Sequence, residues 1–185
     1  MTPAPHTPPP AARRARVRRP ATSEVAEYYR SYVDGVPGDD VLGTLDDEGR
    51  ETERVFGGID EARGTHRYAP GKWSIKELLG HVIDGERVFA YRALRMARGD
   101  ATPLPSFDQD LFVANSGADR RTLADLVAEF RHLRIANLIL FRSLAPEDWE
   151  RHGTASNVPF VVCSFPWILV GHELHHRKVL VERYL

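Results

Sequence analysis

Two histidines that could hold a metal ion lie one helical turn apart near the C-terminus, in residues 171–176 with the sequence GHELHH. At about 100° per residue, His172 and His176 fall near the middle of an apolar stripe, whereas His175 falls at its edge. A pair with this spacing can point two imidazoles at one place, as the zinc-binding helices of metalloproteases do. The alternative is a pair of core histidines bonded to carbonyl groups or water, because buried ring nitrogens need partners.

A third ligand has to come from another helix, and His81 is the best-placed candidate. It is the only histidine in the segment expected to form the second helix, where it borders an apolar arc that includes Val82 and Phe89. The remaining histidines lie in the tail, in connections or beside arginines: His6, His66, His132 and His152. We therefore expect His81, His172 and His176 to hold one divalent ion.

Three neutral imidazoles would leave such an ion its full charge and open positions, an arrangement typical of catalytic rather than structural metals. The donor set fits zinc or nickel first, with iron and manganese as further candidates. Asp84 follows His81 by three residues, and we expect it to orient an imidazole or to accept a proton. The alternative is an ordinary surface carboxylate that pairs with Arg87 or Lys76.

Hydrophobic periodicity predicts four long helical segments. They span about 23–33 with a continuation at 39–59, then 74–98, 121–143, and 165 to the C-terminus. Ser74 followed by Glu77 is a capping-box pattern at the start of the second segment. Residues 102–117 are predicted to form a long loop, and no segment alternates as a strand would. The expected fold is an all-α four-helix bundle.

Residues 1–22 differ in composition from residues 23–185, which we expect to form the single domain. Six of the 13 prolines and a run of five arginines fall in this first segment. Because such a segment has little to bury, we expect a disordered tail or an over-extended translation start. A basic arm that contacts phosphates or anionic lipid is the alternative.

The overall composition favours small-molecule chemistry. The chain has 25 Lys and Arg against 26 Asp and Glu, which argues against nucleic-acid binding by the domain. The lone Cys163 cannot form an intrachain disulfide, and no apolar run reaches the roughly 18 residues of a membrane span. We expect a cytoplasmic, soluble protein with a small-molecule ligand, and a homodimer is kept open as its assembly.

Two motifs in this order resemble the DinB/YfiT-like superfamily of four-helix-bundle metalloproteins. They are KWSIKE at 72–77, followed by GHVID at 80–84, and GHELHH at 171–176. The resemblance covers about residues 24–185. It implies that His81, His172 and His176 ligate one divalent metal, that Asp84 matches the usual aspartate, and that residues 107–110 cover the metal pocket.

The resemblance also implies a range of activities. Members include S-transferases and isomerases that use low-molecular-weight bacterial thiols, and proteins described as metal-dependent hydrolases. The first hypothesis is a metal-dependent transferase or hydrolase that activates a thiol or water against a small molecule. The alternative is a non-catalytic metal-binding protein linked to stress or DNA damage. A nucleic-acid-associated protein that uses the basic tail is the third hypothesis.

Overall fold

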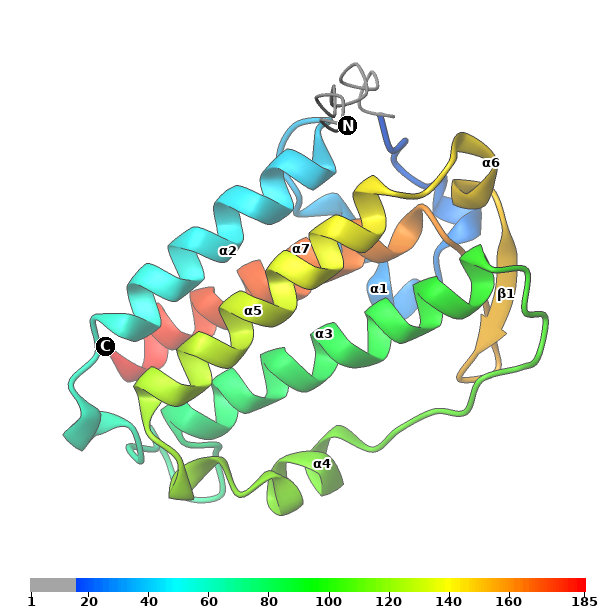
Figure 1. Ribbon diagram of the computed structural model, residues 1–185. Helices are drawn as coiled ribbons and strands as arrows, with labels where there is room; N and C mark the ends of the chain where they lie inside the picture. The colour runs from blue at the N-terminus through cyan, green and yellow to red at the C-terminus, as the bar shows by residue number, and fades with distance from the viewer. Residues whose placement is uncertain (1–15) are drawn as a thin grey trace, which may run out of the picture.

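Four long helices lie side by side and form a bundle in the computed structural model, which describes residues 16–185 (Figure 1). Shorter helices and one hairpin join them. The α-helices are α1 Glu27–Asp34, α2 Val41–Gly57, α3 Ile75–Ala97, α4 Gln109–Ser116, α5 Leu123–Arg142, α6 Pro146–Trp149 and α7 Ser164–Val179. The hairpin consists of β1 His152–Ala155 and β2 Val158–Val161. Single 3-10 turns occupy Thr22–Glu24, Glu61–Arg63 and Ala118–Arg120, and a π-helical turn spans Leu180–Tyr184.

The long helices α2, α3, α5 and α7 confirm the predicted four-helix bundle. Helix α2 packs on α5 and α7, and α3 packs on the same two helices from the other side. The short helix α1 packs against α7, so it is a separate element that lines one side of the bundle. No helix in residues 16–185 is long and apolar enough to cross a membrane.

Helix α3 begins with the capping box that the sequence predicts. The Ser74 hydroxyl accepts a hydrogen bond from the Glu77 backbone N–H at 3.0 Å, and the Glu77 carboxylate accepts one from the Ser74 N–H at 2.8 Å. These two contacts satisfy backbone donors that a helix start otherwise leaves free. The start of α3 at Ile75 is therefore fixed locally, six residues before His81.

A buried arginine on α5 joins all four long helices, because its Nη1 also donates to the Leu45 carbonyl on α2 at 2.7 Å. The Arg134 guanidinium donates from Nε and Nη2 to Glu86 on α3 at 2.8 and 2.7 Å, and its Nη2 lies 2.8 Å from Glu173 on α7. All three side chains are almost completely buried. Burial raises the pKa of Glu173, although the charge of Arg134 opposes this shift. The ion group sets the register of α7, which carries two of the predicted ligands, against α3.

Two expectations for the connections are wrong. Residues 109–116 of the predicted loop form α4, because the Asp108 carboxylate accepts from the backbone N–H groups of Asp110 and Leu111 and caps a helix there. The segment after α6 forms the antiparallel hairpin, whose turn residues Ser156 and Asn157 have φ of 53° and 62°. Its strands have four residues each and one contains a proline, so they show no alternation that a sequence pattern could reveal.

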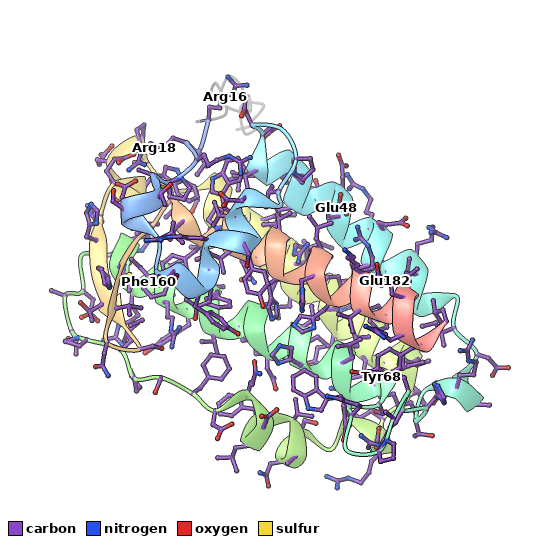
Figure 2. All side chains as sticks on the ribbon, turned by 180° about the vertical axis from the view of Figure 1, so that it is seen from behind. Arg16, Arg18, Glu48, Tyr68, Phe160 and Glu182 are labelled. Atoms are coloured by element: carbon purple, nitrogen blue, oxygen red, sulfur yellow. The ribbon has the colours of Figure 1, made fainter. Side chains whose placement is uncertain are left out.

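The chain packs against the bundle from Val17 onward, a few residues before the domain boundary expected near residue 22. Val17 is 4% exposed, and the Trp167 indole N–H donates to the Arg18 carbonyl at 2.9 Å. The Arg19 guanidinium lies 3.9 Å above the Trp167 ring and donates to the Val33 carbonyl at the end of α1. These arginines bind the protein itself. Figure 2 shows Arg18 and Phe160 at one end of the bundle and Tyr68 at the other.

Candidate metal centre

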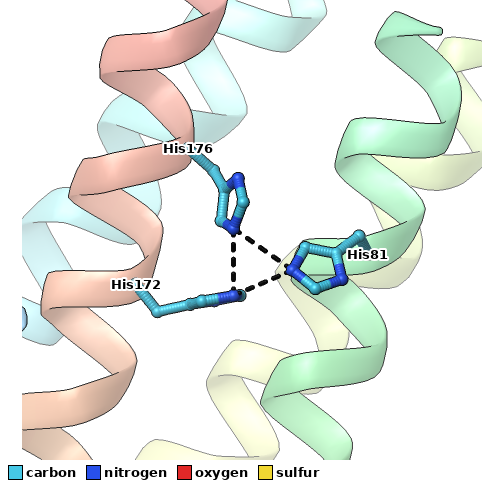
Figure 3. A group of neighbouring side chains, drawn as sticks. All are labelled: His81, His172 and His176. Atoms are coloured by element: carbon cyan, nitrogen blue, oxygen red, sulfur yellow. Dashed lines mark hydrogen bonds between the residues drawn. The ribbon is translucent and has the colours of Figure 1, made fainter. Parts of the chain in front are cut away.

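The three predicted ligands meet at one point between α3 and α7 (Figure 3). The Nε2 atom of His81 lies 3.0 Å from that of His172 and 3.1 Å from that of His176, and the last two are 3.1 Å apart. His81 and His172 are 3% and 7% exposed, and His176 is half-buried. The structure therefore brings together residues that are 91 and 95 positions apart in the chain.

Hydrogen bonds alone cannot account for three such contacts. A hydrogen bond between two rings needs one protonated and one unprotonated nitrogen, and among three nitrogens at least two share the same state. At least one pair is therefore an unfavourable contact unless a cation lies between the rings. The centre of this triangle is about 1.8 Å from each nitrogen, so a point slightly off its plane meets the roughly 2.0–2.1 Å of Zn–N bonds. The donor set thus fits a divalent ion.

Burial keeps the three rings in the neutral form that binds metals. Desolvation lowers the pKa of His81 to about 4 and that of His172 to about 3, and the neighbouring histidines add to the shift at His172. The pKa of His176 is lowered still further, first by burial and then by His172 and His81. At neutral pH the site therefore offers three lone pairs without having to release protons.

Close helix packing positions the rings. A Cβ at Gly85 of α3 would lie 3.0 Å from Cε1 of His172, so a side chain there would push that ring from its place. A Cβ at Gly171 would lie 2.1 Å from the Tyr32 carbonyl oxygen, which shows how closely α1 approaches α7. Tyr32 in turn contacts His172 edge-on, with ring centroids 5.7 Å apart. Both glycines are therefore required by the geometry of the site.

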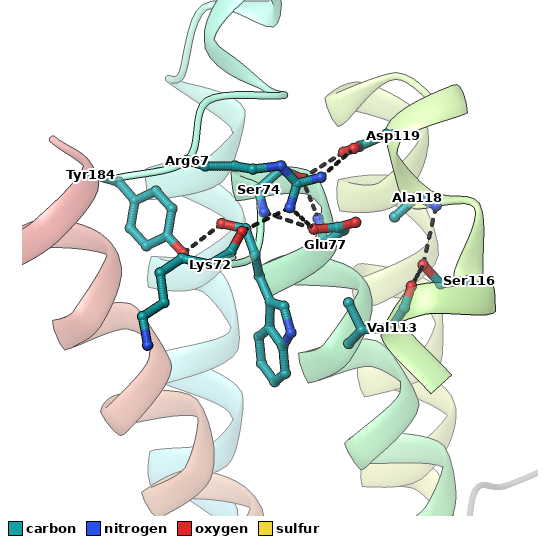
Figure 4. Close-up of polar contacts among 10 residues, drawn as sticks. Arg67, Lys72, Ser74, Glu77, Val113, Ser116, Ala118, Asp119 and Tyr184 are labelled. Carbon is teal, nitrogen blue, oxygen red and sulfur yellow. Dashed lines mark hydrogen bonds and ion pairs between the residues drawn. The ribbon is translucent and has the colours of Figure 1, made fainter. Parts of the chain in front are cut away.

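Trp73 covers the triad at the N-terminal end of α3. Its ring centroid lies 4.7 Å from that of His81, and its carbonyl accepts from the Tyr184 hydroxyl at 2.8 Å. The same loop is held by Arg67, which pairs with Glu77 and with Asp119 (Figure 4). Contacts from three segments of the chain therefore hold the Trp73 indole in place. The sequence motif around 72–77 contains Trp73, but its role as a cover was not expected.

The two other predicted residues lie at the edge of the site. His175 is exposed, as expected, and packs against Tyr32 and His176. Asp84 is half-buried, and burial raises its pKa, while Arg87 opposes the shift. In residues 16–185 no hydrogen bond links Asp84 to the three rings. Its catalytic role therefore stays a prediction.

Two cavities reach the triad from different sides. A cavity of about 510 Å³ touches His176, and a smaller one of about 220 Å³ touches His81 and His172. Helix α4 and the residues before it contribute to both, with Asp110 in the larger and Gln109 in the smaller. This segment borders the pocket, in line with the expectation for residues 107–110. The tyrosines of α1 that line the smaller cavity, Tyr28, Tyr29 and Tyr32, were missed because their helix carries no chemical motif.

Two solved structures share this fold. YfiT from Bacillus subtilis, described as a probable metal-dependent hydrolase with an unusual four-helix bundle topology, is 14% identical with a TM-score of 0.70. The match covers 80% of this chain and 88% of that one. A mycothiol-dependent maleylpyruvate isomerase is 16% identical with a TM-score of 0.63, over 78% of this chain and 61% of that one.

Sequence comparison identifies the family directly. No curated protein matches the sequence. The model of the DinB superfamily matches residues 44–180, a span that contains all three histidines of the site. The chain therefore belongs to the DinB superfamily.

Proposed function

We propose that this protein is a metal-dependent transferase or hydrolase that acts on a small molecule, with one divalent ion held by His81, His172 and His176. The observation that carries the proposal is the meeting of three neutral imidazole nitrogens at one point beside two cavities. Zinc or nickel suits this donor set best, and iron or manganese fits it as well. The descriptions of the two similar structures, one a hydrolase and one a thiol-dependent isomerase, support this class.

The residues around the triad favour chemistry over simple metal storage. A divalent ion bound there would act as a Lewis acid that favours the ionised form of a thiol or water. The imidazoles carry no charge that would weaken this effect. Trp73 and Tyr32 pack against the rings and limit the access of water. The cavities on two sides leave room for two reactants, which favours transfer of a low-molecular-weight thiol to a second small molecule.

Asp84 is the group we assign to proton transfer. It lies one helical turn from His81 on α3, and burial raises its pKa above the usual value of an aspartate. A non-catalytic metal-binding protein would need no such group and no cavities.

The first experiment measures the metal content of protein purified without an affinity tag. His172→Ala and His176→Ala should each remove most of the bound metal, because two imidazoles hold an ion far less tightly than three. His175→Ala is the matched control on the same helix and should retain it. Equal loss from all three variants would show that the ligands lie on another face of α7.

The second experiment tests turnover. Metal-loaded wild-type protein should transfer a thiol to an electrophile, or hydrolyse an activated ester, faster than the His172→Ala variant. A common background rate for both proteins across a panel of thiols, electrophiles and esters would refute catalysis. The non-catalytic, stress-linked metal-binding protein would then be the better account.

A further inference from the structure

A buried arginine without an anionic partner lies behind one end of the smaller cavity, where it contacts the lining residue Ser156. Arg92 follows His81 by eleven residues, about three helical turns, and so lies on the same face of α3. It is 2% exposed. Its Nη2 donates to the Pro105 carbonyl and the Ser156 hydroxyl, both at 2.9 Å, whereas its Nη1 is buried without a hydrogen-bond partner. In residues 16–185 no carboxylate pairs with it.

The Arg92 guanidinium contacts residues that line this cavity, on their side away from it. Its Cζ atom lies 5.9 Å from the Phe89 ring centroid and 5.7 Å from that of Phe107, and both rings line the cavity, as does Ser156. At the other end, the Phe89 ring lies 6.3 Å from that of His172. The cavity therefore extends from the triad to the residues that contact Arg92.

The Ser156 hydroxyl connects this charge to the cavity. Because its oxygen accepts from Arg92, its own proton is available to a further acceptor, and the described residues supply none. A hydroxyl polarised by a cation is a stronger donor than a free one. Burial of an unpaired cation is costly, and desolvation lowers the pKa of Arg92, although a guanidinium remains charged at neutral pH. An anion at this end of the cavity would lower that cost.

We infer that the smaller cavity binds the carboxylate of a small organic acid next to Ser156 and Arg92, with the rest of the molecule directed toward the triad. This inference names the substrate class for the proposed function and rests on it for the reaction. The volume of about 220 Å³ is below the roughly 300–1,000 Å³ of sites for drug-sized ligands, so the acid is small. A purely structural Arg92 would only hold the Pro105 loop against the hairpin turn.

The test compares the binding of acids with that of their uncharged amides by calorimetry. The probes are benzoate with benzamide and butyrate with butyramide, titrated into the full chain both loaded with zinc and treated with chelator. We expect at least one acid to bind ten-fold or more tightly than its amide in both forms. An equal affinity for acids and amides would overturn the inference. A preference lost on chelation would also overturn it, because the metal would then hold the carboxylate.

Variants of Arg92 and Ser156 test where the carboxylate binds. Arg92→Met should abolish the preference for the acid, Arg92→Lys should restore part of it, and Ser156→Ala should weaken acid binding several-fold. The control is Arg95→Met, which removes a cation one turn further along α3 that pairs with Asp100 outside the cavity, and it should leave the preference intact. An unchanged preference in folded Arg92→Met protein would refute the role of the arginine.

Two further outcomes are distinguishable. If Arg92→Met does not fold, Ser156→Ala decides, because it removes a single half-buried hydroxyl, and unchanged acid binding in that variant would overturn the inference. If acids bind as expected but zinc-loaded protein turns over no substrate, the proposed function fails while the carboxylate site stands.

Discussion

Acid should destabilise the metal-free protein through the three histidines of the triad. In the native state the pKa of His81 is about 4, that of His172 about 3, and that of His176 lower still, whereas an unfolded histidine titrates near 6.5. As the pH falls below about 6.5, the histidines of the unfolded chain become protonated, whereas the three rings of the native protein stay neutral. The stabilisation that depends on the three neutral histidines is therefore fully present above pH 6.5 and is lost as the pH falls toward 4.

The expected loss of unfolding free energy follows from the difference between the native and the unfolded pKa values. Between pH 7 and pH 5.5 each histidine lowers the free energy of unfolding by about 1.2 kcal/mol, because only the unfolded ring titrates in this range. The result does not depend on the native pKa values as long as they lie below about 5. The three rings together give about 4 kcal/mol, a large part of the roughly 5–15 kcal/mol that stabilises a typical domain.

Urea unfolding in the presence of chelator, followed by circular dichroism at both pH values, measures this loss. The raised pKa of Asp84 makes its contribution to stability increase, not decrease, as the pH falls. The difference in pH dependence between variants is therefore more informative than the total loss in the wild-type protein. His172→Leu should reduce the pH-dependent loss by about one third, whereas His175→Gln, at an exposed position, should not change it. A His172→Leu protein with the full wild-type pH dependence would show that the native rings are not held neutral by burial.

Three further predictions follow from the packing and the site. Deletion of residues 1–20 should lower the melting temperature by several degrees, because it exposes Trp167 and removes the arginine above it, and an unchanged transition would mean that this segment contributes no stability. Arg134→Met should lower the free energy of unfolding, measured in urea, by about 3–5 kcal/mol, because it leaves Glu86 and Glu173 buried without their cation. A loss below about 1 kcal/mol would refute this role of Arg134. Asp84→Asn should reduce turnover about ten-fold or more with little change in metal content, and equal activity would remove this residue from the mechanism.

Local sequence patterns were sufficient for the long helices and for the placement of two of the three histidines of the triad. His172 and His176 share a helix, so their spacing alone places both imidazoles on one face. The capping box at Ser74 and Glu77 likewise depends on four consecutive residues and forms as predicted. The choice of His81 followed from its place beside an apolar arc, which indicates the buried face of its helix. Such features are decided by contacts within one or two helical turns.

Tertiary contacts decided what local patterns could not. Arg18 and Arg19 belong to the segment expected to be a basic tail, yet both contact Trp167, almost 150 residues away. The Arg18 carbonyl accepts from the indole N–H, and the Arg19 guanidinium lies over the ring. Arg92 was not singled out by any sequence pattern, and its burial results from the hairpin turn and the Pro105 loop, which it contacts in the folded chain. The sequence by itself determined the four long helices and the face that carries each histidine of the triad. The partners of each arginine, the hairpin and the cavities beside the histidine triad depend on which distant segments meet, since burial and charge pairing are properties of the packed chain.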